Sequence, residues 1–271
     1  MLSSPRDIVR NSVKEKLAKN ELVISMIVRL TRGVEIAGIA QSAGFDSLYV
    51  DMEHNSFSLD ATGQICMAAQ AIGVTPLVRV PSLAPEMIAR TLDAGALGIV
   101  APHVASARQA EEVVRAAKFA PIGERSLPGA MPQLRFRTFP AAETMAAIND
   151  ATAVILMMES REALADVDAI AAVEGVDMLL VGTNDLCRSL GIAGQYDDPS
   201  VKDAYARTLD ACRRHGKHVG IGGLGSRPDL MEAFVEMGAR YVSLGNDLSF
   251  LLAGCMAGVR RMREATARLS G

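Results

Sequence analysis

Short runs of mainly apolar residues alternate along the chain with longer segments in which apolar residues recur at helical spacing. A run that is apolar at nearly every position is typical of a strand buried on both faces, as in a parallel sheet covered by helices. The longer segments are typical of helices that bury one face. We expect eight strands, at residues 23–28, 47–51, 76–80, 98–101, 153–158, 176–181, 217–221 and 241–244.

Helices are expected between and after these strands, and a glycine follows several of them where a left-handed residue commonly ends a helix. The helices cover residues 33–43, 58–72, 84–94, 106–118, 160–172, 227–237 and 248–267. Repeated alternation of strand and helix in 271 residues predicts an α/β fold, a (β/α)8 TIM barrel built as a single domain over residues 1–271. The active site of such a barrel lies at the C-terminal ends of its strands.

Residues 119–140 interrupt this alternation. The segment contains four prolines, three arginines and no clean periodicity, so it is expected to be a long loop. Long loops in compact domains are usually functional, which favours a lid or an interface segment. The alternative is a disordered surface insertion.

Composition and charge exclude several classes of protein. A formal net charge of −3, with no cluster of basic residues interleaved with aromatics, argues against nucleic-acid binding. No apolar run approaches the length of a membrane span, and the first twenty residues lack the apolar core of a secretory signal. We therefore expect a cytoplasmic protein that binds neither nucleic acid nor membrane.

Polar residues that can do chemistry gather at the ends of the expected strands. Because these ends meet at one rim of a barrel, the side chains should share one site. Two of them are carboxylates, Glu159 and Asp185, which at adjacent strand ends predict a hard-cation site with open positions, suited to Mg²⁺, Mn²⁺ or Co²⁺. The full set is Asp51, Glu53, His54, Arg79, His103, Glu159 and Asp185.

Structural roles compete with functional ones for some of these residues. A single histidine at a strand end, such as His54, is more often structural than catalytic, although its neighbours here favour catalysis. Arg79 has the alternative of a structural salt bridge to Asp51 or Asp93. Met157 lies within a buried run and is expected to be a core residue.

Five motifs in this order and spacing resemble the HpcH/HpaI aldolases, which are class II pyruvate aldolases, over nearly the whole chain. The motifs are Asp51-Met52-Glu53-His54, Val78-Arg79-Val80-Pro81, Leu92-Asp93-Ala94-Gly95-Ala96, Glu159-Ser160-Arg161-Glu162-Ala163-Leu164 and Val181-Gly182-Thr183-Asn184-Asp185-Leu186. The resemblance implies a barrel of the phosphoenolpyruvate/pyruvate type. It also implies cleavage and formation of 4-hydroxy-2-oxo acids through the enolate of pyruvate, with a 2-oxo acid and an aldehyde as the small-molecule partners.

The resemblance also implies roles for the site residues. Glu159 and Asp185 hold the divalent ion, Arg79 places a positive charge beside the enolate oxygen, and His54 is the base. Asp93 raises the basicity of His54 in the family, and Asp51 is a second candidate for that role. The substrate carboxylate is received by the turn formed by Gly182, Thr183, Asn184 and Asp185.

Assembly is a further implication of the resemblance. Related aldolases form hexamers, as trimers of dimers, in which the terminal helix is exchanged between barrels. The apolar terminal segment from Leu248 to Val259 agrees with such an exchange, because it is apolar on more than one face. In that assembly the long loop reaches a neighbouring site and brings Arg125 near the incoming aldehyde.

Departures from the family pattern concern substrate contacts. Met157 stands where many relatives have Gln, and Gly182-Thr183-Asn184-Asp185 replaces Gly-Pro-Ala-Asp, so that the side chain of Asn184 becomes available to substrate. Three functions remain open at this point. They are a metal-dependent aldolase, a CoA-thioester or citrate-lyase-type lyase on the same barrel, and a non-catalytic barrel that serves as a binding module.

Overall fold

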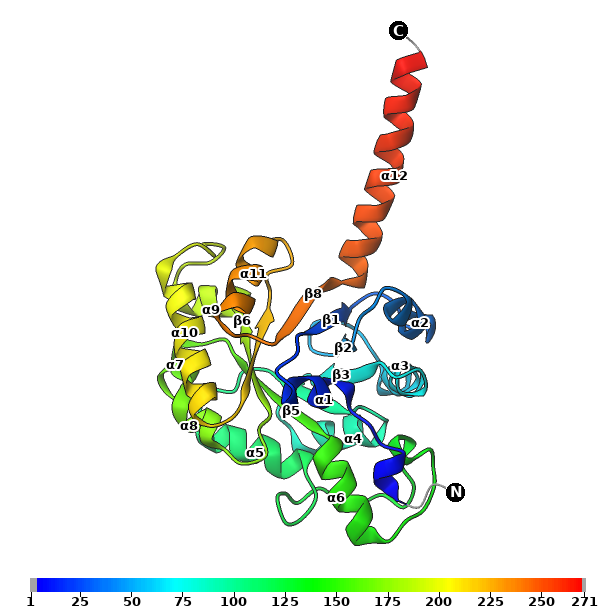
Figure 1. Ribbon diagram of the computed structural model, residues 1–271, viewed down its shortest axis with the longest axis vertical. Coiled ribbons are helices and arrows are strands. Elements are labelled where there is room, and N and C mark those ends of the chain that lie inside the picture. Colours follow the sequence, from blue (N-terminus) through cyan, green and yellow to red (C-terminus); the bar gives the residue numbers. More distant parts are fainter. Residues whose placement is uncertain (1–3, 270–271) are drawn as a thin grey trace.

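Eight parallel strands close into a barrel in chain order, as Figure 1 shows for this computed structural model, which describes residues 4–269. This arrangement confirms the expected (β/α)8 barrel. Each expected strand is present within a few residues of its expected bounds. The strands are β1 (Val23–Val28), β2 (Ser47–Asp51), β3 (Thr75–Arg79), β4 (Gly98–Ala101), β5 (Ala153–Met158), β6 (Met178–Gly182), β7 (His218–Gly222) and β8 (Tyr241–Asn246).

Helices cover the outside of the barrel, apart from the first, which closes its N-terminal end, and the last, which extends away from it (Figure 1). The long helices are α1 (Ser12–Ala18), α2 (Glu35–Ser42), α3 (Leu59–Ala71), α4 (Pro85–Asp93), α5 (Ala107–Ala117), α6 (Ala141–Ala151), α9 (Thr183–Leu190), α10 (Pro199–Arg214), α11 (Pro228–Met237) and α12 (Asp247–Leu269). The helix expected over residues 160–172 is divided into α7 (Arg161–Ala165) and α8 (Val167–Ala172). The division falls at Asp166, whose carboxylate accepts a hydrogen bond from the backbone N–H of Ala107 at the start of α5 (2.7 Å).

The core has two apolar layers. The larger layer lies between the strands and the surrounding helices. The smaller one fills the barrel interior, where Tyr49, Leu77 and Tyr241 pack together with Val13 and Leu17 of α1. Because α1 precedes β1, it closes the barrel at the N-terminal ends of the strands. The opposite rim, at the C-terminal ends, is the one left open for a site.

Residues 119–140 form an ordered loop that contains one 3-10 helix, η2 (Pro132–Leu134). Phe119, Met131 and Leu134 are buried in an apolar cluster with residues of α6. The amide of Gln133 donates to the carbonyls of residues 92 and 96, at the turn between α4 and β4. That turn lies at the N-terminal end of the barrel. The loop is therefore neither a disordered insertion nor a lid over its own site, and the interface role stays a prediction.

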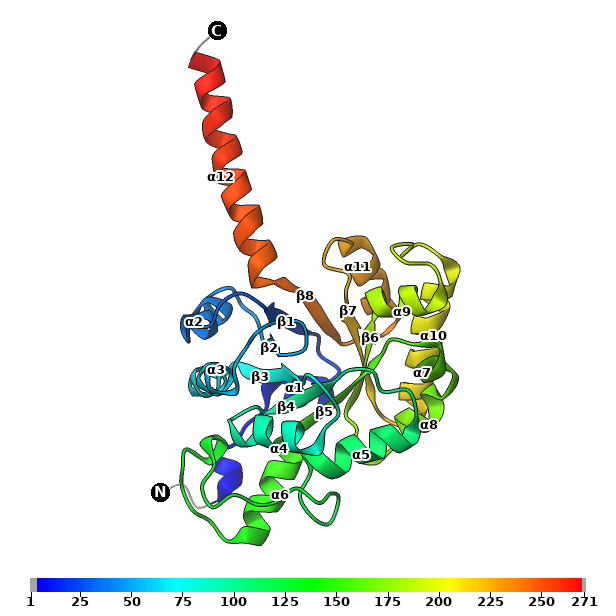
Figure 2. The same cartoon turned by 180° about the vertical axis from the view of Figure 1, so that it is seen from behind.

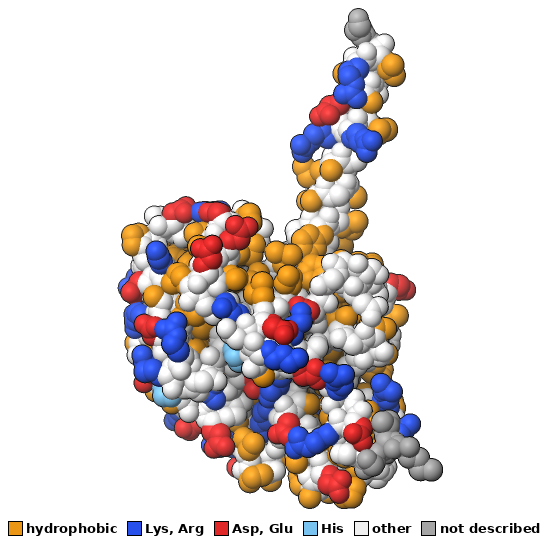
Figure 3. All heavy atoms as spheres, viewed as in Figure 1, with side chains coloured by type: hydrophobic (Ala, Val, Ile, Leu, Met, Phe, Trp, Pro, Cys, Tyr) orange, Lys and Arg blue, Asp and Glu red, His pale blue; other side chains and the backbone are white. Residues whose placement is uncertain are grey.

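The last helix does not pack on the barrel. Figures 1 and 2 show α12 extending away from the strands along most of its length. Its exposed apolar side chains line the shaft of the helix in Figure 3 and include Leu248, Leu251, Leu252, Met256, Val259 and Met262. Neither α12 nor any other helix within residues 4–269 combines the length and the apolarity needed to cross a membrane. The barrel thus lacks a covering helix of its own beside β8.

Candidate active site

A cavity of about 570 Å³ opens at the C-terminal ends of the strands. The sequence predicts the catalytic and binding residues at this same rim. Most of the expected site residues line the cavity, namely Asp51, His54, Arg79, Met157, Gly182, Asn184 and Asp185. Glu159 stands directly behind Gly182, where a Cβ atom on that glycine would lie 2.8 Å from Oε2 of Glu159. Only glycine therefore allows the carboxylate so close to the cavity wall.

Asp51 and Arg79 form a buried ion pair in the lining of the cavity. The guanidinium of Arg79 donates from Nε to Oδ1 at 2.9 Å, and its Nη2 lies 2.8 Å from Oδ2. Burial disfavours the charged form of Asp51, but the hydrogen bonds and charge of Arg79 outweigh it, so the pKa of Asp51 is lowered. The structural salt bridge between Arg79 and Asp51, which the sequence offered as an alternative role for Arg79, is therefore present. The remaining guanidinium nitrogen, Nη1, lies 2.7 Å from Oε2 of Glu53.

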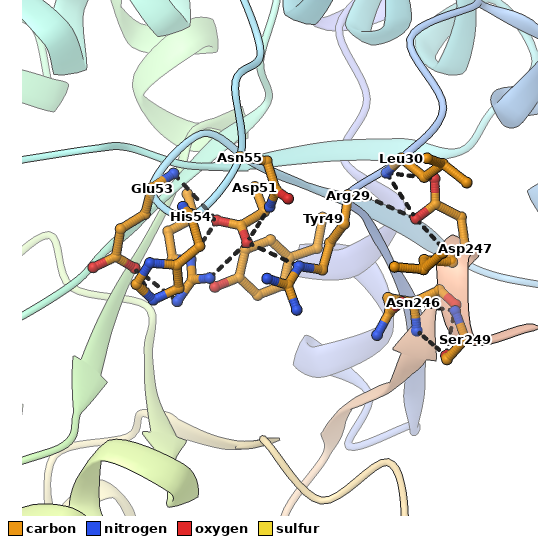
Figure 4. Close-up of polar contacts among 12 residues, drawn as sticks. Arg29, Leu30, Tyr49, Asp51, Glu53, His54, Asn55, Asn246, Asp247 and Ser249 are labelled. Carbon is orange, nitrogen blue, oxygen red and sulfur yellow. Dashed lines mark hydrogen bonds and ion pairs between the residues drawn. The ribbon is translucent and has the colours of Figure 1, made fainter.

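The turn after β2 is organised by Asp51 and presents His54. Oδ1 of Asp51 accepts the backbone N–H groups of Glu53 (3.2 Å) and His54 (3.3 Å), while Asn55 donates its side-chain amide to Oδ2 (2.8 Å). The His54 ring is half exposed, with Nε2 3.6 Å from Oε2 of Glu53 (Figure 4). Asp51 therefore positions His54 through the backbone, and the carboxylate beside the ring belongs to Glu53.

Asp93 is not close to His54 within the chain. It is the last residue of α4, which runs back from the C-terminal rim, so it lies at the opposite end of the barrel. Its Oδ1 is 2.6 Å from Nη2 of Arg125, whose side chain is only 1% exposed and lies over the ring of Phe119. Within one chain Asp93 does not approach His54, and its predicted role in raising the basicity of His54 stays a prediction. The guanidinium of Arg125 is turned into its own chain, and its predicted place near the aldehyde of a neighbouring site stays a prediction.

A cluster of carboxylates surrounds His103. The backbone N–H of His103 donates to Oε1 of Glu159 (2.6 Å), and its ring nitrogens lie 2.8 Å from Glu159 and 2.7 Å from Glu53. The ring of His103 therefore lies between two buried carboxylates, and the sequence pattern did not predict this arrangement. The sequence signal for a role of His103 in the site was its position just after β4.

Glu159 and Asp185 fit a divalent cation. Burial raises the pKa of Glu159, and the nearby charges of Asp185 and Glu53 raise it further, although His103 opposes them. A buried carboxylate with acidic neighbours is stabilised by a cation. Within residues 4–269, no three His, Cys, Asp or Glu side chains converge into a closed metal cage. The pair would leave coordination positions for substrate and water. Asp185 also accepts Nε of Arg188 at 3.1 Å.

The turn after β6 offers backbone donors and one side chain. Helix α9 begins at Thr183, as the proposed anion site requires. The hydroxyl of Thr183 donates to the carbonyl of Gly222 (2.7 Å) and contacts Tyr205 (2.9 Å), so this side chain faces the core, and a substrate contact through the backbone N–H of Thr183 stays a prediction. Tyr196 donates to Oδ1 of Asn184 (2.7 Å), which leaves the amide NH₂ of Asn184 on the cavity side.

Met157 is part of the barrel core, as expected, and also part of the cavity floor. Its Sδ lies 3.8 Å from the hydroxyl of Tyr49 and 4.0 Å from Nη1 of Arg79. The thioether therefore packs against the guanidinium of Arg79 and offers the cavity only a weak hydrogen-bond acceptor.

Together these features define a (β/α)8-barrel enzyme with an acid pair, a fixed guanidinium and an exposed histidine on one rim. The family model for HpcH/HpaI aldolase/citrate lyase matches residues 26–253, and the chain belongs to this family. It is similar to a 4-hydroxy-4-methyl-2-oxoglutarate aldolase of Hapsidospora irregularis, at 37% identity over 91% of this chain and 92% of the relative. A second aldolase of that name, from Chaetomium globosum, is 34% identical over 94% of this chain and 97% of the relative.

A solved structure agrees with these relatives. The HpcH/HpaI aldolase from Desulfitobacterium hafniense superposes with a TM-score of 0.88 at 32% identity, covering 94% of this chain and 98% of that one. The chain is therefore an aldolase, a carbon–carbon lyase. Of the three functions left open by the sequence, the comparisons support the aldolase, and its dependence on a metal stays a prediction.

Proposed function

We propose that this aldolase cleaves and forms 4-hydroxy-2-oxo acids with pyruvate as the carbon nucleophile, and that it uses Mg²⁺, Mn²⁺ or Co²⁺ held by Glu159 and Asp185. The observation that carries the proposal is the placement of this acid pair on the same rim as Arg79 and His54. The names of the two fungal relatives support the substrate class, because 4-hydroxy-4-methyl-2-oxoglutarate is a 4-hydroxy-2-oxo acid.

Each residue of the site has a separate role in forming the enolate. A divalent ion, when bound, supplies charge stabilisation for the oxygens of the 2-oxo acid. Arg79 adds a fixed positive charge beside the developing oxyanion, and its pairing with Asp51 removes the need to reorient it during the reaction. His54 removes the methyl proton and holds it on its ring. The N-terminal backbone of α9 receives the carboxylate.

A lysine Schiff base is the competing route to the same enolate. No lysine is among the residues of the described chain that line the cavity. Borohydride added together with pyruvate is therefore expected to leave the activity unchanged, whereas a Schiff-base enzyme would be trapped.

The experiment is exchange of the pyruvate methyl protons into D₂O, followed by NMR. Treatment with EDTA should abolish the exchange, and Mg²⁺, Mn²⁺ or Co²⁺ should restore it. Glu159→Gln should lose both the exchange and the binding of Mn²⁺ measured by calorimetry. As a matched control, Glu162→Gln changes an exposed acid three residues further on and should retain both. Full exchange in excess EDTA would contradict the metal-dependent mechanism.

We also propose that the protein is a homo-oligomer in which α12 packs against another copy. The exposed apolar face of α12 and the exposed side chains Leu30, Val34 and Ile39 near the start of the barrel support this. Burial of such surfaces stabilises an assembly. A hexamer arranged as a trimer of dimers is the assembly that the family resemblance implies, and exchange of α12 between barrels would cover both surfaces.

A further inference from the structure

A second arginine, Arg29, lines the cavity directly after β1 and has no part in the mechanism above. Its backbone is held firmly. The buried carboxylate of Asp247, at the start of α12, accepts the N–H groups of Arg29 (2.9 Å), Leu30 (3.0 Å) and Thr31 (2.7 Å). Figure 4 shows how this contact ties the end of β1 to the end of β8. The backbone of Arg29 is therefore held in a defined position.

The guanidinium of Arg29 is poorly paired. Among residues 4–269 its only side-chain partner is Asp51, with Nε 3.6 Å from Oδ2, too far for a hydrogen bond. Asp51 is already engaged by Arg79 and Asn55. The Nε atom of Arg29 is buried and has no hydrogen-bond partner in the described chain. Its side chain is 40% exposed, against 12% for Arg79, so its charge remains available to the cavity.

The cavity wall beside Arg29 comes from two neighbouring strands. Between Arg29 and Asp185 it is formed by the ends of β7 and β8, which contribute glycines, neutral polar side chains and the apolar Leu244. Gly222, Gly223 and Gly245 are part of this lining, and Asn246 lies close to the start of α12. No acidic side chain of β7 or β8 lines this part of the described cavity. An anion placed there meets a cation without meeting a carboxylate from these strands.

We propose that Arg29 binds the carboxylate of the carbonyl acceptor, so that the enzyme favours an acceptor that is itself a 2-oxo acid over a neutral aldehyde of similar size. The proposal rests on the proposed aldolase function of the same site. In the addition step, C3 of the pyruvate enolate forms a bond to the carbonyl carbon of the acceptor, and the acceptor oxygen takes up a proton. In cleavage, the same bond breaks, its electron pair returns to the enolate, and the hydroxyl proton is released. Arg29 does not exchange a proton in either direction.

The test compares two acceptors, glyoxylate and glycolaldehyde, which differ in the carboxylate. The readout is the ratio of their kcat/KM values with pyruvate and Mg²⁺, because a ratio cancels any general loss of activity. Arg29→Met is expected to lower this ratio roughly 30-fold, the effect of losing a charge-assisted hydrogen bond. Arg29→Lys should lower it less, because the charge remains and the fork is lost.

Arg32 provides a matched control on the same loop. Its guanidinium donates to the carbonyl of Leu30 and to Ser56 and lies over the ring of Phe57, outside the cavity lining. Arg32→Met should leave the ratio at the wild-type value. Should Arg29→Met fail to fold, Arg29→Lys decides the question alone, and an unchanged ratio overturns the proposal.

Failure of this inference is distinguishable from failure of the aldolase function. If the wild-type protein shows no metal-dependent exchange of pyruvate protons, the proposed function fails and the acceptor site fails with it. If exchange occurs but the acceptor ratio is the same with and without Arg29, only the acceptor site is wrong. A parallel loss of proton exchange and of activity with both acceptors would place Arg29 at the donor and would also overturn the proposal.

Discussion

Asp51 and Arg79 are direct partners in the register of β2 and β3, and their side chains form a two-point contact at 2.9 and 2.8 Å. The same carboxylate fixes the backbone of the turn that carries His54. The buried carboxylate of Asp51 therefore positions both the guanidinium of Arg79 and the turn that carries His54.

Substitution at the Asp51–Arg79 pair should separate stability from activity. Arg79→Lys is expected to lower the rate of pyruvate proton exchange roughly 100-fold, because an ammonium group does not reproduce the guanidinium fork. Asp51→Asn should lower the free energy of unfolding by about 3 kcal/mol, since it leaves the largely buried Arg79 with Glu53 as its remaining close carboxylate. Urea denaturation measures the second effect. The double variant Asp51→Asn/Arg79→Met should recover part of the loss, and strict additivity would argue against coupling.

The base is tested by comparing two histidines. His54→Ala should reduce proton exchange roughly 1,000-fold while leaving Mn²⁺ affinity close to the wild-type value, because the change removes a base and not a ligand. His103→Gln should retain more of the exchange, because the ring of His103 is already occupied by Glu53 and Glu159. The reverse order of the two variants would make His103 the base.

Lys118, which lies far from the active site, should make the stability of the protein depend on pH. Its ammonium group is buried and donates to the carbonyls of Asn149 (2.7 Å) and Thr152 (2.5 Å). Burial lowers the pKa of Lys118 from 10.5 to about 8. Between these values the unfolded chain holds more protons than the folded one, so the free energy of unfolding contributed by this group rises as the pH rises.

The comparison protein for this effect is Lys118→Met. From pH 7 to pH 10 the wild type should gain about 2 kcal/mol of unfolding free energy relative to the variant, as measured by urea denaturation at each pH. A difference that stays constant over this range would mean that the amine titrates alike in both states.

The terminal helix predicts an assembly that charge can disrupt. Leu252→Asp/Met256→Asp places two charges on the exposed apolar face of α12 and should yield a monomer of 28.7 kDa by light scattering, whereas the wild type should be larger. Ala257→Asp puts a charge on the opposite side of the helical repeat and should leave the assembly intact. A monomeric wild type at micromolar concentration would contradict the assembly.

The sequence by itself determined the barrel and the rim that carries the chemistry. Runs such as Ala153–Met158 are apolar at every position, so they form strands buried on both faces, and parallel strands must all end at the same rim. For that reason Arg79 and Asp185 were placed together correctly from local patterns alone. Glycine 44, 73, 95, 216 and 238 adopt the positive φ expected of helix ends, and this too is a local property of the backbone.

Only the tertiary structure decided which side chains meet. Asp93 pairs with Arg125 instead of approaching His54, because α4 carries it to the other end of the barrel before the chain turns. Arg29 depends on Asp247, a residue more than two hundred positions away, which lies beside it only because closure of the barrel places β8 next to β1. Such contacts are set by the register and rotamers of elements distant in sequence. Periodicity and motif spacing carry no information about them.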